Sequence, residues 1–184
     1  MSNAIQQIAD NMLYLWEEAI SHPVKMVRIV INPGDESMLK AFYDYMLAID
    51  SDEEDMVFVI ALPFMSVVEY SDKVLRYIER QIEYWNDSDK PEDIIFERID
   101  WTPDFTLGSK DNPAQLVVEN FNRLAKVIVG GTDMKCSFVF DIEGTQEYEE
   151  CRFWFEQALS LPFNAQMVWG ISDIIGQEQF GDIM

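Results

Sequence analysis

The chain has 184 residues, of which 48% are hydrophobic and 13% aromatic, so it is long and apolar enough to bury one sizeable core and is not generally disordered. Thirteen Lys and Arg residues oppose 34 Asp and Glu residues, which gives a formal net charge of −21. This charge argues against nonspecific binding to nucleic acid or to anionic membranes, because both would repel the protein. It favours solubility or a basic partner.

The sequence carries no sign of export or of membrane insertion. The first twenty residues have neither a basic segment nor an uninterrupted apolar run, and no stretch approaches the 18 apolar residues that a spanning helix needs. Two cysteines, Cys136 and Cys151, are too few for a disulfide scaffold and both lie in apolar surroundings. We therefore expect a cytoplasmic protein with two reduced, buried thiols.

The first half of the chain alternates helical and strand patterns. Apolar residues at helical spacing predict an amphipathic helix over residues 4–20, and an apolar run predicts a strand over 24–31. A turn at Asn32-Pro33-Gly34 precedes a predicted helix that runs to about residue 49. Residues 56–62 are almost continuously apolar, which is typical of a strand covered on both faces in a parallel sheet.

The second half repeats this alternation. Residues 66–85 show the longest amphipathic pattern, and residues 94–99 are interpreted as a short third strand. Asn112 as N-cap and Pro113 at the first helical position predict the start of another helix, which Gly130-Gly131 closes. A second unit of strand, helix and strand is predicted from residue 135 to about residue 172.

Each half therefore contains a strand, a helix and a second strand, with boundaries at about 24–86 and 113–173. Such βαβ units predict an α/β fold with an open, mostly parallel sheet of about five strands and helices on both faces. No linker interrupts the pattern, so one domain over residues 1–184 is expected. Few identical residues align between the halves. Recurrence of a common structural unit therefore explains the similarity of their patterns as well as an internal duplication does.

No metal site is predicted. The run from Asp50 to Asp55 resembles the start of a calcium loop, but Asp55 stands where such a loop requires Gly and Ala61 where it requires Glu. A single histidine and two separated cysteines also argue against a zinc site.

No catalytic residue is predicted either. His22 precedes a proline in a predicted loop, and no G-x-S-x-G motif accompanies it. Acidic neighbours of Cys151 oppose a lowered thiol pKa. We therefore expect no enzyme and no bound cofactor.

One segment carries a resemblance to a known family. Residues 138–143, FVFDIE, form an apolar run that ends in acids and resemble the magnesium-side strand of P-loop NTPases, and Ser172 and Asp173 end the next predicted strand. The phosphate-binding loop G-x-x-x-x-G-K-[ST] is absent. The resemblance thus implies a degenerate nucleotide-binding domain, with Asp141, Glu143 and Asp173 near its pocket.

The aromatic content points instead to binding of another protein. Three consecutive rings, Phe153, Trp154 and Phe155, span about 200° of a helix, so at least one is exposed unless the helix is covered on nearly all sides. Exposed Tyr, Trp and Phe are common interface anchors. The predicted anchors are Tyr43, Tyr45, Trp101, Phe153 and Trp154, within an acidic rim of Asp52, Glu53, Glu54 and Asp55.

The sequence therefore favours a non-enzymatic, acidic protein-protein interaction module that serves as a subunit or adaptor of an assembly. Two alternatives stay open. One is the degenerate P-loop-like domain, and the other is an acidic inhibitor, immunity-type or DNA-mimic protein that binds a basic partner. All three leave the partner's identity and the oligomeric state undetermined.

Overall fold

The computed structural model describes residues 3–47, 55–89, 98–177, 179–181 and 183. The chain begins with α1 (Asn3–Ser21), β1 (Met26–Ile31), α2 (Glu36–Met46) and β2 (Met56–Ala61), and continues with α3 (Val67–Asp87), α4 (Gln115–Val129), β3 (Cys136–Asp141), α5 (Tyr148–Leu159) and β4 (Met167–Ile174). None of these helices is both long and apolar enough to cross a membrane.

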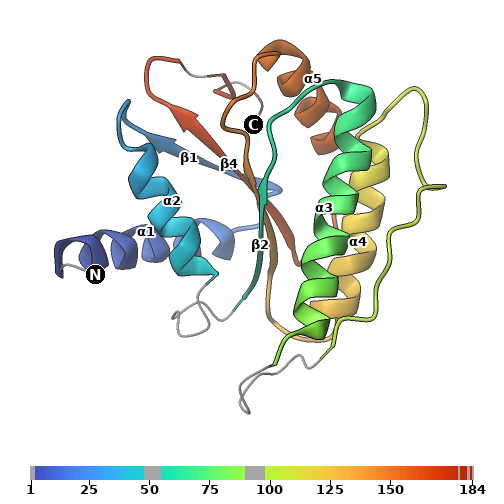
Figure 1. The fold of residues 1–184 in the computed structure, drawn as a ribbon, viewed down its shortest axis with the longest axis horizontal. Coiled ribbons are helices and arrows are strands. Elements are labelled where there is room, and N and C mark those ends of the chain that lie inside the picture. Colours follow the sequence, from blue (N-terminus) through green and yellow to red (C-terminus); the bar gives the residue numbers. More distant parts are fainter. Residues whose placement is uncertain (1–2, 48–54, 90–97, 178, 182, 184) are drawn as a thin grey trace.

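The strands form one open, all-parallel sheet in the order β1-β4-β3-β2 (Figure 1). The predicted α/β class, with a parallel sheet and helices on both faces, is confirmed. The described residues hold four strands where the sequence predicted about five. Of the expected third strand, residues 94–97 lie outside the described residues, and residues 98–99 are not in a strand.

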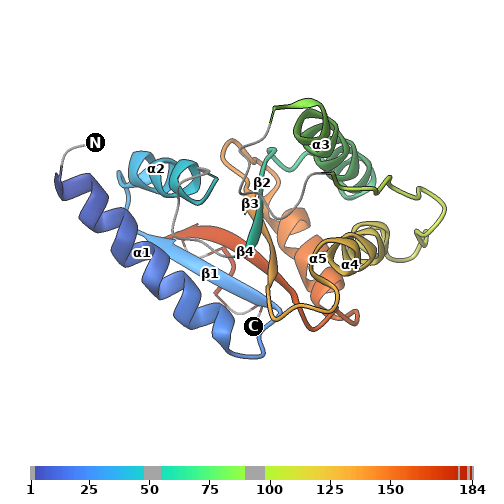
Figure 2. The same ribbon diagram turned by 90° about the horizontal axis from the view of Figure 1, so that it is seen from below.

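The path of the chain reverses within the sheet. From β1 at one edge it crosses to β2 at the other edge through α2, and it returns to β3 through α3 and α4 and to β4 through α5. Helices α1 and α2 cover one face, and α3, α4 and α5 cover the other (Figure 2). The second predicted βαβ unit joins neighbouring strands, whereas β1 and β2 of the first unit are parallel but lie at opposite edges.

The larger core lies between the sheet and helices α3, α4 and α5. Aromatic rings fill it: Trp154 stacks on Trp169 with ring centroids 5.7 Å apart, and Phe121 stacks on Phe138 at 3.9 Å. All four rings have 0% exposure. Burial of side chains of this size supplies much of the free energy of folding.

Buried polar groups tie this core together. The indole Nε1 of Trp154 donates to Ser71 Oγ at 2.9 Å, and that hydroxyl donates to the carbonyl of Pro113 at 2.7 Å. The fully buried Asn120 accepts from the amide of Asp104 at 2.7 Å and donates to the carbonyl of Asp104 at 3.0 Å. These bonds hold irregular segments against α3, α4 and α5 at a low desolvation cost.

Helix starts agree with the sequence in one case and differ in another. Ser66 caps α3, because its hydroxyl accepts from the amide of Glu69 at 3.3 Å. Helix α4 begins at Gln115 rather than at residue 113, and Asn112 does not cap it. The side-chain amide of Asn112 instead donates to the carbonyl of Gln157 at 3.4 Å, which ties this turn to α5.

The smaller core lies under α1 and α2. Trp16 of α1 sits directly on Gly170 of β4, where an added Cβ would lie 2.9 Å from the indole Cη2 atom. A glycine is therefore required for α1 to approach the sheet this closely.

Candidate functional site

A cavity of 330 Å³ opens where β1, β4 and β3 end, and we call it the strand-end pocket. Because β1 leads to a helix on one face and β3 to a helix on the other, this is the crevice at which open parallel sheets bind ligands. The polar and charged side chains that line it are Glu36, Lys40, Asp141, Glu143, Tyr148, Ser172, Asp173, Gln177 and Gln179.

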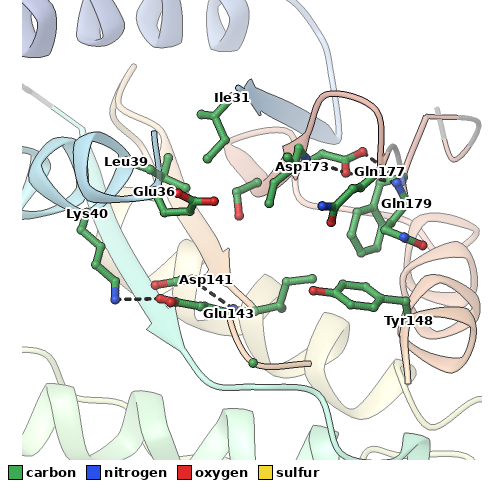
Figure 3. A pocket seen from close by; sticks show the side chains of 15 residues that line it. Ile31, Glu36, Leu39, Lys40, Asp141, Glu143, Tyr148, Asp173, Gln177 and Gln179 are labelled. Carbon is green, nitrogen blue, oxygen red and sulfur yellow. Dashed lines mark hydrogen bonds and ion pairs between the residues drawn. The ribbon is translucent and has the colours of Figure 1, made fainter. Parts of the chain in front are cut away.

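Helix α2 contributes one acid and one base. Glu36 lies in its first turn, where a negative charge is stabilised, and its carboxylate accepts from the amide of Gly34 at 3.3 Å. Lys40, one turn later, contacts Glu143 with 2.7 Å between Nζ and Oε2 (Figure 3). This hydrogen bond and the charge of Glu143 raise the pKa of Lys40 above its usual value. The only cation among the lining residues is thus already paired.

Asp141 ends β3 and is half-buried. Its Oδ1 accepts from the amide of Glu143 at 3.2 Å. No described cation lies within ion-pair distance of Asp141, although its charge also helps to raise the pKa of Lys40. Figure 3 shows the Glu36 and Asp141 carboxylates on neighbouring walls of the pocket, beside the Lys40–Glu143 pair. With Lys40 taken by Glu143, these two carboxylates leave an excess of negative charge in the pocket.

Asp173, on the adjacent strand β4, has a different role. It is 4% exposed, and its Oδ1 accepts from the amides of Ile174 at 2.9 Å and Gln179 at 3.1 Å. Its Oδ2 accepts from the amide of Phe180 at 3.1 Å and lies 3.4 Å from Arg28 Nη1. This carboxylate is saturated by the chain itself and holds the C-terminal segment on the sheet.

Tyr148 lines the pocket, whereas Tyr43 is buried beside the lining residue Ser172 and does not line the pocket itself. The ring of Tyr148 extends from α5 with its hydroxyl toward the cavity (Figure 3), and burial, with the charges of Cys151 and Asp173, raises its pKa. Tyr43 of α2 is buried, near Ser172 and Asp141. Its pKa is raised mainly by burial, against the opposing effect of the Ser172 hydroxyl. At neutral pH both phenols are therefore uncharged and able to donate a hydrogen bond.

The structure brings together the three acids that the P-loop resemblance placed near a pocket: Asp141, Glu143 and Asp173 all line it. Sequence reasoning missed Glu36, Lys40 and Tyr148 as lining residues. A usable signal existed, since residues that follow parallel strands meet at one edge of the sheet.

Three of the five predicted anchors lack the exposed surface that an anchor needs, which corrects that prediction. Tyr43 is 3% exposed, Trp101 7% and Trp154 0%, because their rings fill the two cores. Phe153 is 53% exposed, so of the three consecutive rings one faces solvent as predicted. Tyr45 is half-buried, and its hydroxyl donates to Asp10 at 3.2 Å.

The predicted acidic rim falls mostly on Asp52, Glu53 and Glu54, which lie outside the described residues. Asp55 is described and is half-buried, and its carboxylate accepts from the amide of Lys135 at 2.6 Å. It therefore fixes the start of β2 beside the start of β3.

Neither cysteine has the surroundings of a nucleophile. Cys136 and Cys151 are free and buried, as predicted. Burial raises the pKa of both thiols, that of Cys151 to about 12. His22 follows α1 and does not line the strand-end pocket. In the described part of the chain, no group of three or more His, Cys, Asp or Glu side chains is arranged to hold a metal ion.

Comparison with known proteins gave no match, either to a protein-family model, to a curated protein or to a solved structure.

Proposed function

We propose that the protein is a non-enzymatic binding module for a basic protein, and that a lysine or arginine side chain of that partner enters the strand-end pocket. The observation that carries this proposal is the pair of Glu36 and Asp141. Both carboxylates line the pocket, and the lysine there is paired with Glu143.

The electrostatic balance of the pocket favours a cationic group. A carboxylate near an arginine or lysine forms charge-assisted hydrogen bonds, which are roughly twice as strong as neutral ones. Glu36 and Asp141 each accept one backbone amide and retain further lone pairs. The Tyr148 hydroxyl, on the opposite wall in Figure 3, adds an acceptor oxygen for a second donor of the same group.

The net charge of −21 supports the same partner class. A strongly acidic protein attracts a basic surface over a distance of about 10 Å at moderate salt, so encounter becomes faster. The overall negative charge then attracts the basic partner, while the pocket fixes the position of the partner's lysine or arginine side chain. An adaptor and an inhibitor could both bind a basic partner in this way. They would differ in whether the partner stays active once it is bound.

The test compares two variants of equal charge. Glu36→Gln with Asp141→Asn removes the two open pocket carboxylates, while Glu83→Gln with Asp87→Asn removes two exposed acids from the last turn of α3. Binding of a labelled arginine-rich peptide is measured by fluorescence anisotropy at about 150 mM salt. We expect the pocket variant to bind about tenfold more weakly, which corresponds to one lost charged contact, and the α3 variant to bind within about twofold of the parent.

Equal weakening in both variants would contradict the proposal, because the peptide would then respond only to total charge. The same peptide with citrulline in place of arginine serves as the ligand control, since citrulline keeps the shape and loses the charge. Binding of the citrulline peptide to the parent protein with unchanged affinity would also contradict the proposal.

A nucleotide ligand is the second candidate, favoured by the position of Asp141 at the crevice where such sheets bind nucleotides. Carboxylates would hold its phosphates only through bridging magnesium, because Glu36, Asp141 and Glu143 repel them directly. A rise in melting temperature with Mg-ATP but not with the arginine peptide would favour this candidate.

A further inference from the structure

Strand β1 leaves one backbone edge open. Its carbonyls at Lys25 and Ile31 accept from the amides of Trp169 and Ile175, so the odd-numbered residues of β1 face β4. The N–H and C=O groups of Met26, Arg28 and Val30 then point away from the sheet. Within the described ranges, no backbone group bonds to them. An open edge of this kind is a template for another strand.

Helix α1 lies along this edge (Figure 2), and a groove of 280 Å³ separates the two. Met12, Leu15 and Ala19 line it from the helix, and Val27, Ile29 and Val30 line it from the strand. Leu15 is 54% exposed. The helix thus has a second apolar stripe beside the one that it buries in the core. We call this surface the β1 edge groove.

The strand side of the β1 edge groove carries no acid, whereas α1 on the helix side carries the exposed acids Glu17 and Glu18. Residues 22–31 contain Lys25 and Arg28 and no acid, in a chain of net charge −21. Lys25 Nζ donates to the carbonyls of Leu159 and Leu161 at 2.6 and 2.7 Å, and Arg28 pairs with Asp173. Both cations of the strand are thus held within the chain, and the strand edge, in contrast to the net charge of −21, brings no carboxylate toward a second copy.

We propose that a second copy of this chain docks at the β1 edge groove, with the two β1 strands antiparallel across a two-fold axis. The outward groups dictate the register: Arg28 lies opposite its counterpart, and Met26 lies opposite Val30 of the partner, so that outward-facing residues pair. The two sheets become one continuous sheet, and both α1 helices lie on the same face, where their exposed stripes face each other.

In this register the two Arg28 side chains lie opposite each other, and their charges are compensated within each chain. Two arginines opposite each other would destabilise the pairing, but each is held by Asp173 of its own chain. The dimer uses neither Glu36 nor Asp141, so it is independent of the proposed binding function.

The test is sedimentation velocity of the full chain from low micromolar to about 100 µM. We expect a dimer for the parent protein. Val30→Pro removes only an outward N–H and leaves the bonds to β4 in place, and it is expected to weaken dimerisation at least tenfold. Leu15→Glu places a charge on the α1 stripe and is expected to do the same without a change of fold, because Leu15 is exposed.

Tyr84→Glu is the matched control, since Tyr84 is 79% exposed on α3, across the sheet from the groove. It should leave the dimer intact. A parent protein that is monomeric at about 100 µM would overturn the proposal, as would a dimer that both Val30→Pro and Leu15→Glu leave unchanged. Loss of the dimer in Tyr84→Glu alone would place the interface on α3 and also overturn it.

Discussion

Two polar side chains of the core beneath α3, α4 and α5 differ from two carboxylates of the strand-end pocket in how many of their hydrogen-bonding positions are used within the chain. In the core, the indole of Trp154 and the amide of Asn120 are buried with partners that the chain itself supplies. In the pocket, Glu36 and Asp141 each hold one backbone amide and keep lone pairs free. Trp154 and Asn120 thus use their hydrogen-bonding groups within the fold, whereas Glu36 and Asp141 keep the acceptor capacity that the proposed binding of a cationic group requires.

The largest change in the free energy of unfolding is expected at Trp154, and the adjacent ring of Phe153 on α5 serves as its comparison. Trp154→Ala removes a fully buried indole and should lower the free energy of unfolding by about 3–5 kcal/mol. Phe153→Ala removes a ring that is 53% exposed and should change it by less than about 0.5 kcal/mol. Urea unfolding followed by circular dichroism measures both. Equal losses in the two variants would contradict the assignment of Trp154 to the core.

A second comparison concerns two carboxylates at neighbouring strand ends. Asp173→Ala leaves three backbone amides without an acceptor and should destabilise the protein by about 1–3 kcal/mol. Asp141→Ala removes a single such bond from a half-buried position, and the loss should stay below about 1 kcal/mol. The two melting temperatures decide between these roles. A larger loss in Asp141→Ala would show that Asp141 is also structural.

Alkaline pH should weaken the core. Burial raises the pKa of the Cys151 thiol from 9.0 to about 12 in the folded state, so the stability that this group contributes is fully present below pH 9. It is lost as pH rises from 9 toward 12, because the unfolded state then gives up the proton first. Tyr43, Tyr70 and Cys136 shift in the same direction.

The measurement is the free energy of unfolding across this pH range. We expect a fall with rising pH in the parent protein and a shallower fall in Cys151→Ala, whose stability at pH 7 is the reference. Stability that is constant up to pH 12, or an identical slope in both proteins, would contradict the burial of an uncharged thiol.

Lys40→Gln should barely change the stability of the protein and should strengthen its binding of the peptide. Lys40→Gln removes an exposed ion pair, so stability should change by less than about 0.5 kcal/mol. It also frees Glu143, so the pocket becomes more negative and should bind the arginine-rich peptide a few-fold more tightly. Anisotropy and thermal melting measure the two quantities. Weaker peptide binding in Lys40→Gln would contradict the account.

Most of the fold could be predicted from the sequence because local patterns determine it. The continuous apolar run at 56–62 indicated a strand covered on both faces, and Ser66 marked the region where α3 begins. Strand order could not be predicted, because neighbouring strands such as β1 and β4 are separated by more than 130 residues. The start of α4 was misplaced because Asn112 bonds to a distant residue, Gln157, rather than to the helix.

The candidate site could be predicted only in part. Asp141 and Asp173 were recognisable as acids that end predicted strands, yet nothing local distinguishes an open carboxylate from a saturated one. The anchor prediction was wrong for the helix residues Tyr43 and Trp154, because helix spacing gives the angle between side chains but not which side a sheet covers. The sequence therefore predicted Trp154 and Phe153 as anchors on the same grounds, whereas in the structure Trp154 is buried and Phe153 is exposed.

Binding of a cationic side chain in the strand-end pocket can be followed by a two-dimensional amide NMR titration of the protein with Nα-acetyl-arginine amide, with the citrulline analogue as control. We expect saturable shifts for the arginine ligand at amides of the pocket walls, including Gly34, Glu143, Gly144 and Ser172, and none for citrulline. Shifts that scatter over acidic surfaces such as the α3 helix, with the pocket amides unmoved, would contradict binding in the strand-end pocket.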